Sequence, residues 1–571
     1  MVALLAVVLV LGLLVTRQFG ESWDEPRFYS YADHALQAYS TWPTAGTIPL
    51  TGPTFDNYGP AFIMAVALVA RSLRPILGWS ISDLRHLLYF VTFLAGVWAF
   101  YELSKRWLAP IAAGGATLLF ATQPLFIGHA FINPKDIPFL SFFLLSLSSG
   151  LRLFDSFEPL PSGGLSLRSR RSLLVLTGLW LASVVGLLAI TDAVHTLLTN
   201  LGVGARFTLF IQLRAAFLLL SSFLLILLYR KRLPSAFRLL LAIAPAAILL
   251  GLTTCIRALG PLAGLLVALH AFRVKGRQAV VPLAVYAFLA GAASYATWPY
   301  LWPNPIGRLI GSVQMMAHYP WPGRVLFNGA YYASTDLPRS YLPVLLAIQL
   351  TEPVWALFIV GSTVAILRAK EKRDLLILTA IWFILPLAGF IALRSPLYDN
   401  GRQVMFILPP VFLLAGVAFE RIKRRALQIA LITVCVLPGV IGGVRLHPYE
   451  YVYYNRFIGG EPGALRRFEL DYWGTSYREV SAWLNANAPT AATIYANGPA
   501  LLLTHLRSDL TLYSAHEAAR AEHYDYVVST SRYNLDLTSY PDAPIVHAIT
   551  RDGAVLAVIK QPGRLAAAPT R

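Results

Sequence analysis

The sequence predicts a mainly α-helical, polytopic membrane protein with a small α/β domain at its C-terminal end. Hydrophobic residues make up 56% of the 571 residues and charged residues 13%, which is about half the charged fraction of an average soluble protein. Apolar runs of about 20 residues, the length that a helix needs to cross a bilayer, recur along the chain. Short clusters of basic residues lie between these runs, as is typical of cytoplasmic loops.

The basic residues predict contact with membrane lipids and not with nucleic acid. The net charge is +18, but each basic cluster lies at the edge of an apolar run, as expected for loops on the cytoplasmic side of a membrane. The two cysteines, Cys255 and Cys435, lie inside apolar runs without paired spacing. The sequence therefore predicts neither a disulfide framework nor a cysteine metal site.

With the basic clusters taken as cytoplasmic markers, the apolar runs predict about thirteen spans in the plasma membrane, with the N-terminus in the cytoplasm. The first run has no basic segment before it and no small-residue cleavage site, so it is predicted as a span and not as a signal peptide. Residues 58–73 are expected to form an amphipathic helix at the external interface, because a crossing there would break the alternation of loops. The predicted spans are 2–17, 85–104, 109–127, 138–153, 172–190, 207–229, 237–254, 258–272, 279–297, 343–367, 374–393, 403–420 and 426–443.

The predicted organisation is a transmembrane domain over residues 1–443, with external loops at 18–84 and 298–342, followed by an extracytoplasmic domain over 444–571. The loop at 298–342 is rich in Trp and Pro, as interfacial segments are. In the C-terminal domain, hydrophobic periodicity and turn residues predict helices at 476–489 and 515–525, strands at 491–496 and 524–530, and a hairpin over 543–561 with an Asp552-Gly553 turn.

Two adjacent carboxylates, Asp24 and Glu25, follow the first span. On a helix, neighbouring side chains point about 100° apart, so the two cannot flank one bond as the carboxylate pair of a glycoside hydrolase does. One can face a cavity while the other braces it. The alternative is a helix start with Ser22 as N-cap and two acids in the first turn.

Two further polar islands are expected on the same external face. The first, at 129–139, contains His129, Asn133, Lys135 and Asp136. Ionisable residues at the edge of a membrane indicate function, and the alternative is an Asn/Pro turn with Asp136 as helix cap.

The second polar island, at 394–410, contains Arg394, Tyr398, Asp399 and Arg402. The planar fork of an arginine suits a phosphate. The alternative is an interfacial loop with arginines that extend to the headgroups, which is favoured for Arg394. Among more isolated residues, Arg257 is a candidate buried or re-entrant charge, and for His318, Arg324 and His447 an anchoring role is favoured over ligand binding.

An external face with an acid, several cations and aromatic residues suits an amphiphile with a lipid tail and an anionic head, such as a polyprenyl-phosphate sugar. The cations would bind the phosphate and stabilise it as it leaves. The carboxylate would accept a proton from the acceptor hydroxyl that attacks the anomeric carbon. A single displacement would invert that carbon, and the acceptor is left open among protein, lipid and glycan.

The motifs "DEPRFYSYA", "YGPAF", "NPKDIPF" and "YDNGRQVMFILPP" resemble the fold-C (GT-C) membrane glycosyltransferases, in particular the superfamily of protein O-mannosyltransferases and lipid A aminoarabinose transferases. The resemblance covers residues 1–443, and "HPYEYVYYNRFIGG" resembles the tails of bacterial members. It implies a catalytic domain at 1–443, with Asp24 as the base and Glu25 as a support for the acceptor or the helix.

The same resemblance places Lys135 and Asp136 in a polar motif of the second loop and Arg402 near the lipid phosphate. In one departure, the chain has Asn57-Tyr58-Gly59-Pro60 where some members carry a lysine before two prolines. Phosphate contacts would then come from residues such as Lys135, which weakens an aminoarabinose-type assignment. Metal dependence varies in the superfamily, so a divalent metal is left open, although the sequence contains no ligand cluster that demands one.

These arguments predict an enzyme without an assigned cofactor or metal ligand. Asp24 and Glu25 are the predicted catalytic residues, and the donor phosphate is assigned to Lys135, Arg402 and Arg257. The predicted substrate-binding residues are Arg27, Tyr31, His129, Asn133, Asp136, Tyr398, Asp399 and His447. The main alternative, a transporter or lipid-linked-sugar flippase, predicts ionisable residues throughout the spans, whereas the spans here contain few acids. A silent scaffold is the third class, which the external acids and cations disfavour.

Overall fold

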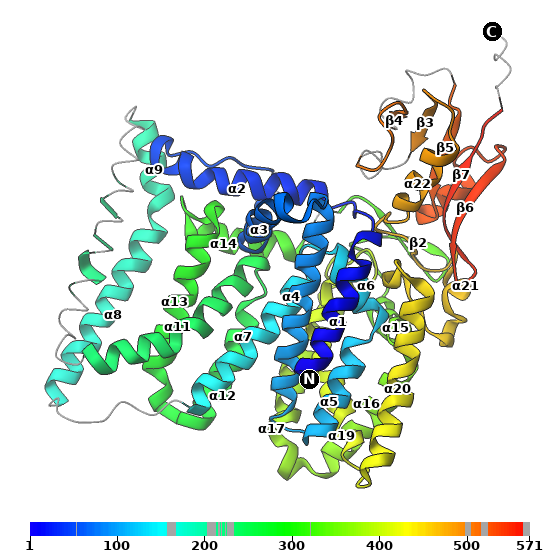
Figure 1. Ribbon diagram of the computed structural model, residues 1–571. Coiled ribbons are helices and arrows are strands. Elements are labelled where there is room, and N and C mark those ends of the chain that lie inside the picture. Colours follow the sequence, from blue (N-terminus) through cyan, green and yellow to red (C-terminus); the bar gives the residue numbers. More distant parts are fainter. Residues whose placement is uncertain are drawn as a thin grey trace. The chain divides into compact units, whose positions relative to one another are not determined.

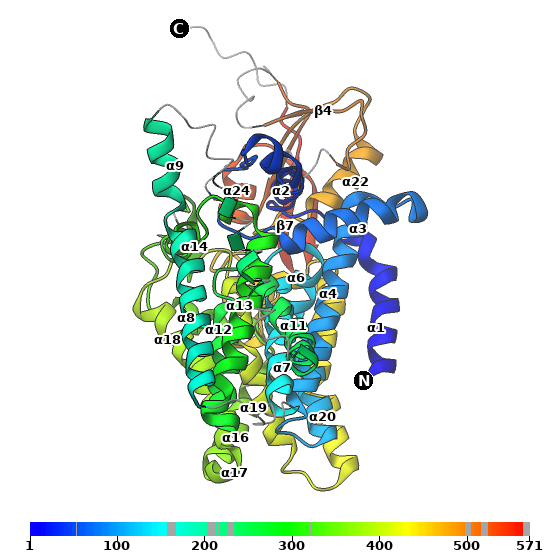
Figure 2. The same ribbon diagram turned by 90° about the vertical axis from the view of Figure 1, so that its left-hand side faces the viewer.

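The computed structural model describes residues 1–52, 54–156, 167–201, 210, 213–214, 217–218, 220–222, 224, 233–319, 321–496, 504–514 and 523–563. It divides into two compact units (Figures 1 and 2). The first unit contains Met1–Arg27, Val69–Ser141 and His318–Arg571, and the second contains Phe28–Leu68 and Phe142–Ala317. Three helices contribute residues to both units: α2 (Glu25–Ala45), α3 (Ala61–Leu77) and α7 (Asp136–Ser156).

The first unit is a helical bundle joined to a C-terminal domain. Its helical elements up to the end of the bundle are α1 (Val2–Val15), η1 (Thr16–Gln18), α4 (Ile81–Ser104), α5 (Pro110–Ala121), α6 (Pro124–Ile132), α15 (Tyr341–Gln349), α16 (Glu352–Leu367), α17 (Ala369–Thr379), η5 (Ala380–Ile384), α18 (Leu385–Ala392), η6 (Arg402–Ile407), α19 (Pro409–Phe419) and α20 (Arg425–Leu446). Helix α19 is buried along its whole length and packs against α5 and α16. Gly361 permits this packing, because a Cβ there would lie 1.8 Å from the Leu414 carbonyl oxygen.

The loops of this bundle gather at two opposite ends. At one end, Glu420 accepts hydrogen bonds from Lys372 Nζ and from the backbone N–H of Ala109, both at 2.8 Å. These contacts join the loop α4–α5, the first turn of α17 and the loop α19–α20, which carry basic clusters, and we call this the basic end. The loops α1–α2, α6–α7 and α18–η6 lie at the other end with the C-terminal domain (Figure 1), and we call this the site end.

Six described helices are long and apolar enough to cross a membrane, and the number rises to eight if two bent helix pairs each count as one span. The structure thus supports a multi-pass membrane protein, but the prediction of thirteen spans is not confirmed. The predicted span 207–229 lies mostly outside the described residues, those at 258–272 and 279–297 form one apolar stretch, Pro261–Thr297, and α19 has only 11 residues. Helix α3 covers most of 58–73 and is not among the candidate spans.

The two bent pairs, α5–α6 and α15–α16, bend by 60° and 108°. Gln123, at the break between α5 and α6, forms hydrogen bonds with Thr351, at the break between α15 and α16. The backbone N–H of Thr351 donates to Gln123 Oε1 at 3.0 Å, and Gln123 Nε2 donates to Thr351 Oγ1 at 3.1 Å. Irregular backbone at membrane depth needs protein partners of this kind, since lipid supplies no hydrogen bonds. Each break therefore gives the other the partners that lipid lacks.

The C-terminal domain is built on a mixed five-stranded sheet (Figure 1). The strand order is β4 (Thr511–Tyr513), β3 (Thr493–Ala496), β5 (Tyr526–Thr530), β7 (Ala554–Lys560), β6 (Ile545–Arg551), with β3 parallel to β4 and β5, and β7 antiparallel to β5 and β6. Its other elements are η7 (Glu450–Val452), η8 (Arg456–Ile458), α21 (Gly460–Ala464), α22 (Tyr477–Asn487), η10 (Arg532–Asn534) and α24 (Leu535–Thr538).

The helix expected at 476–489, both strands and the hairpin of this domain are confirmed. The hairpin turns at Asp552 and Gly553, whose φ angles of 48° and 86° fit the left-handed turn that joins twisted strands. Of the helix expected at 515–525, residues 515–522 lie outside the described residues. Strand β4 is an addition to the predicted elements.

The second unit is helical in its described parts. Its elements are α8 (Leu167–Ala189), α9 (Thr191–Asn200), α11 (Leu233–Ile256), α12 (Pro261–Lys275), η3 (Gly276–Ala279), α13 (Val280–Thr297), η4 (Pro299–Leu301) and α14 (Pro305–Ala317). The expected loop 298–342 therefore contains helix α14, and in the first unit it forms a hairpin of β1 (Arg324–Phe327) and β2 (Ala330–Ala333).

The motif Asn57-Tyr58-Gly59-Pro60 has a packing role in this second unit. A Cβ on Gly59 would lie 1.9 Å from the carbonyl oxygen of Cys255, and Asn57 Oδ1 accepts a hydrogen bond from Ser312 Oγ at 2.9 Å. Tyr31 Oη donates to the carbonyl of Tyr58 at 2.5 Å. The departure from the lysine-containing motif therefore coincides with a backbone contact that only glycine allows.

Candidate active site

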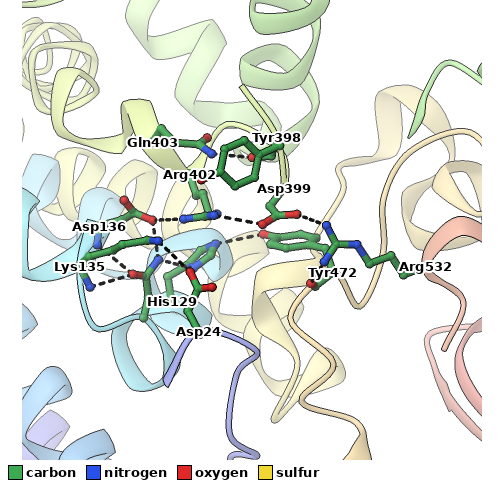
Figure 3. Close-up of polar contacts among 11 residues, drawn as sticks. Asp24, His129, Lys135, Asp136, Tyr398, Asp399, Arg402, Gln403, Tyr472 and Arg532 are labelled. Carbon is green, nitrogen blue, oxygen red and sulfur yellow. Dashed lines mark hydrogen bonds and ion pairs between the residues drawn. The ribbon is translucent and has the colours of Figure 1, made fainter. Parts of the chain in front are cut away.

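Two neighbouring groups of ion pairs at the site end involve residues from three separate loops and the C-terminal domain (Figure 3). All of their members belong to the first unit. Three carboxylates pair with three cations: Lys135 contacts Asp24. Arg402 contacts both Asp136 and Asp399, and Asp399 also contacts Arg532. We call these six residues the site cluster.

Asp24 lies directly before α2, where Lys135 Nζ donates to its Oδ2 at 2.7 Å. The lysine side chain is 7% exposed and the aspartate 27%, so the carboxylate is the accessible member of the pair. Burial would by itself raise the pKa of Asp24, but the positive charges of Lys135 and Arg402 outweigh that effect and hold its pKa below the ordinary value. Asp24 is therefore ionised and bound to a cation.

The turn before α7 sets the position of Lys135. Asn133 Oδ1 accepts the backbone N–H groups of Lys135 at 3.0 Å and Asp136 at 2.8 Å, which caps the start of the helix. Asn133 is therefore the capping residue. The alternative considered from the sequence, an Asn/Pro turn with Asp136 as the helix cap, named a different residue. The carboxylate of Asp136 is instead available to Arg402.

Arg402 lies at the centre of the site cluster, with its side chain only 1% exposed. Nη1 donates to Asp136 Oδ2 at 2.8 Å and Nη2 donates to Asp399 Oδ2 at 3.0 Å. Its guanidinium carbon lies 4.7 Å from the ring centre of Trp473 and 5.1 Å from that of Tyr398. Ion pairs fix the edges of the guanidinium while aromatic rings contact it, which is an arrangement suited to arginine and not to lysine.

His129 is fully buried and supports the turn that carries Lys135. Asn133 Nδ2 donates to His129 Nδ1 at 3.1 Å and to Asp136 Oδ2 at 2.9 Å. Because Nδ1 accepts, the ring proton lies on Nε2, which contacts Tyr472 Oη at 3.0 Å. The predicted substrate contacts His129 and Asn133 thus hold the site in place through the protein itself.

Tyr398 borders the site cluster in an aromatic stack. Its ring lies parallel to Trp321, with centres 4.5 Å apart, and Tyr319 stacks at 5.8 Å. Its backbone carbonyl accepts a hydrogen bond from Gln403 Nε2 at 2.7 Å (Figure 3). An aromatic surface of this kind suits the apolar face of a sugar or the start of a lipid chain.

Glu25 lies outside the site cluster, although it neighbours Asp24 in sequence. Its Oε2 accepts the backbone N–H of Ser22 at 2.7 Å and its Oε1 contacts His86 Nε2 at 3.0 Å. The hydroxyl of Ser22 donates to the carbonyl of Ile132 at 3.0 Å, which joins this segment to the end of α6. Glu25 thus supports the start of the helix, and its side chain is fully buried with that of His86.

The other predicted site residues are dispersed. His447 contacts Gln18 Oε1 at 2.9 Å and Glu450 Oε1 at 2.7 Å, so the structure does not bring it to the site cluster. Arg27 is exposed in the first turn of α2, where its charge adds to the lowering of the pKa of Asp24. Tyr31 and Arg257 belong to the second unit and are not described with the site cluster.

Four contributors were not predicted from the sequence: Arg532, Trp321, Tyr472 and Trp473. Arg532 Nη1 donates to the carbonyl of Tyr472 at 2.7 Å, and Nη2 donates to Asp399 Oδ1 at 2.5 Å. Nothing in "TSRYN" distinguishes this arginine from the other arginines of the C-terminal domain. The aromatic residues gave a weak signal through the Trp-rich loop and the "LDYWG" segment.

The donor set does not fit a divalent metal. Asp24, Asp136 and Asp399 each bind a lysine or arginine, whereas a metal site needs carboxylate oxygens directed at one point. Among the residues that the structure describes, no group of three or more His, Cys, Asp or Glu side chains is placed to hold a metal ion. Three acids and three bases leave the site cluster close to electrical neutrality.

No family model and no curated protein matches the chain. Among solved structures, it is similar to ArnT, an aminoarabinose transferase of Cupriavidus metallidurans, in the apo state (TM-score 0.46) and bound to undecaprenyl phosphate (TM-score 0.47). Both matches have 13% identity and cover 98% of this chain and 97% of that chain.

The chain is also similar to AglB, an oligosaccharyltransferase of Archaeoglobus fulgidus, in complex with an inhibitory peptide and a dolichol-phosphate. That match has a TM-score of 0.38 and 12% identity, over 92% of this chain and 69% of that chain. ArnT and AglB are both GT-C fold enzymes, the group that the sequence motifs resemble.

Proposed function

We propose that the protein is an inverting membrane glycosyltransferase that moves a sugar from a polyprenyl-phosphate donor to an acceptor hydroxyl. The observation that carries the proposal is the placement of an accessible carboxylate, Asp24, on Lys135 and beside Arg402. A base next to two cations is what displacement of a phosphate from an anomeric carbon needs. Residues 1–443 supply the base and both phosphate-binding cations, and the domain at 444–571 adds Arg532.

In the proposed reaction, the donor phosphate binds Lys135 and Arg402 with its lipid chain in the bilayer. The acceptor oxygen forms a bond to the anomeric carbon from the face opposite the phosphate, and the carbon–oxygen bond to the phosphate breaks. The electron pair of that bond leaves with the phosphate, whose negative charge the two cations stabilise. Asp24 takes the proton of the acceptor hydroxyl.

The ion pair between Asp24 and Lys135 gives this mechanism an order of events. While the pair is intact, the pKa of Asp24 is low, so the carboxylate is a weak base. A donor phosphate that draws Lys135 away removes the nearest positive charge, and the pKa of Asp24 then rises. The carboxylate thus becomes an effective base only when the donor is bound.

The charge distribution supports an extracytoplasmic site in the plasma membrane. Lys105, Arg106 and the clusters at 368–373 and 421–425 lie at the basic end, which the positive-inside rule assigns to the cytoplasm. The site end and the C-terminal domain then face outward, and the N-terminus is cytoplasmic. A polyprenyl-phosphate sugar presented on the outer leaflet would reach the site cluster from the lipid.

The test is sugar transfer by the full chain in nanodiscs, with labelled polyprenyl-phosphate hexoses and pentoses and with protein, lipid and glycan acceptors. We expect release of polyprenyl phosphate with one donor and inversion at the anomeric carbon, both lost in Asp24→Asn. Retained turnover in that variant would exclude Asp24 as the base. In sealed proteoliposomes, movement of intact donor across the bilayer without release of phosphate would instead identify a flippase.

A further inference from the structure

Arg532 and Arg402 share one carboxylate. Arg402 Nη2 binds Asp399 Oδ2 at 3.0 Å and Arg532 Nη2 binds Asp399 Oδ1 at 2.5 Å, so each arginine holds a different oxygen (Figure 3). We propose that Arg532 is a positioning residue that retains Asp399 when Arg402 turns to the donor phosphate, and thereby strengthens donor binding. The inference rests on the proposed function, in which Arg402 is a phosphate ligand.

The need for such a residue follows from the bonding of Arg402. In the structure this guanidinium is held by two carboxylates, Asp136 and Asp399, and its side chain is buried. A phosphate can form two parallel hydrogen bonds with this guanidinium only if one of the two carboxylates no longer binds it. Asp399 would then be a buried anion without a cation, a state that is strongly unfavourable.

Arg532 removes that difficulty because it neutralises Asp399 whether or not Arg402 stays. It is held in place independently of Arg402: its backbone N–H donates to Thr530 Oγ1 at 2.8 Å and its Nη1 donates to the Tyr472 carbonyl. The two residues that follow, Tyr533 and Asn534, have φ angles of 56° and 55°, and the resulting tight turn fixes the arginine at the end of β5.

The charge of the site cluster leads to the same conclusion. With Arg532 present, three cations balance three acids, and loss of Arg532 would leave one net negative charge where an anionic donor must bind. Both effects weaken the binding of a phosphate, and both act through Asp399. Removal of the Asp399 charge should therefore cancel the loss of Arg532, which a general destabilisation of the domain would not allow.

The experiment measures binding of undecaprenyl phosphate to the full chain in nanodiscs for the wild type, R532Q, D399N and the double variant. We expect R532Q to weaken binding by about tenfold and the double variant to return to within about threefold of the wild type. Arg466→Gln is the matched control, since Arg466 pairs with Asp536 in the same domain and away from Asp399. It should bind as the wild type does.

The outcomes separate this inference from the proposed function. If R532Q binds undecaprenyl phosphate as tightly as the wild type, the inference is wrong and the glycosyltransferase proposal stands. Weakened binding that D399N does not restore, or an equal loss in R466Q, would also overturn it, because Arg532 would then act through domain packing. If the wild-type protein binds no polyprenyl phosphate, the proposed function itself fails, and this inference fails with it.

Discussion

The two ends of the first unit each contain a lysine–carboxylate pair of nearly the same geometry. Lys135 lies 2.7 Å from Asp24 at the site end, and Lys372 lies 2.8 Å from Glu420 at the basic end. The exposed fractions are also similar, at 7% and 27% in the first pair and 14% and 23% in the second. Distance and burial alone do not distinguish them.

The surroundings of the two pairs differ. Glu420 also accepts the Ala109 N–H, and Lys372 donates to the carbonyl of Trp107, so this pair ties loops together through backbone groups. The Asp24–Lys135 pair lies beside Arg402, which binds Asp136 and Asp399. Aromatic rings contact the guanidinium of Arg402. The proposed functional pair thus differs from the other in the further charges around it and not in its own strength, which for a single pair near a surface is small.

The largest effect that tests this comparison is expected from Asp24→Asn. The amide keeps the size of the side chain but accepts no proton, so we expect transfer to fall about 10³-fold, within the range for loss of a general base. Glu420→Gln is the matched control at the basic end and should stay within about threefold of wild-type turnover. Both variants are assayed for transfer and for thermal unfolding in nanodiscs.

An equal loss of transfer in the two variants would show that each pair acts only through folding. The distinction between the Asp24 and Glu420 pairs would then be wrong, and Asp24 would no longer be assigned as the base. A loss confined to Asp24→Asn with an unchanged unfolding temperature would support a role in transfer for Asp24 that Glu420 does not share.

Arg402→Lys should have the next largest effect. Lysine keeps the positive charge but cannot bridge Asp136 and Asp399 while contacting Trp473 along a flat face. We expect kcat/KM for the lipid donor to fall about 100-fold, or about 2.7 kcal/mol in the transition state. Arg445→Lys, an exposed arginine paired with Asp552, is the control, and donor titrations provide the measurement. Wild-type kcat/KM in Arg402→Lys would show that a point charge suffices at this position.

Glu25→Gln should affect stability and not the chemical step. The variant keeps the side-chain shape but loses the charge that contacts His86 Nε2 and the Ser22 N–H. We expect the free energy of unfolding to fall by about 2 kcal/mol, as for hydrogen bonds to a buried charged group. Turnover per folded molecule should remain within about threefold of the wild type. A drop as large as that of Asp24→Asn would restore Glu25 as a catalytic residue.

The sequence predicted which loops meet at the site because loop alternation follows from charge and hydropathy. Asp24, Lys135, Asp136, Asp399 and Arg402 lie on three loops that had been assigned to one face, and the structure brings all five together. Adjacent residues were harder to separate, because the sequence could not show that Glu25 turns to His86 while Asp24 turns to Lys135.

Contributions from distant segments were beyond the sequence argument. Arg532 reaches Asp399 across 133 positions through the fold of the C-terminal domain, and no local pattern encodes that contact. Helix breaks were missed for a similar reason: hydropathy gives one span over 343–367, whereas the Gln123–Thr351 contacts stabilise a bend between α15 and α16. The elements of the C-terminal sheet were predictable because strand periodicity and the Asp552-Gly553 turn are local signals.

The smallest expected effect is a pH dependence of stability that originates in the C-terminal domain. Burial raises the pKa of Glu469 to about 7, against an opposing effect of Arg532 and with a further increase from Asp399. In the unfolded chain the same carboxyl ionises near 4.5, so the folded state binds the proton more tightly. Stability from this group is complete below about pH 4.5 and is lost as the pH rises toward 7.

Between pH 6 and pH 7.5 this carboxyl should lower the free energy of unfolding by about 1 kcal/mol. Burial likewise raises the pKa of Glu461 to about 7, so Glu469→Gln should remove about half of the pH dependence, whereas Glu420→Gln should keep all of it. Thermal unfolding in nanodiscs at the two pH values measures the difference. An unchanged slope in Glu469→Gln would mean that Glu469 is ionised in the folded protein. Glu469 would then count as a second negative charge beside Asp399 and Arg532.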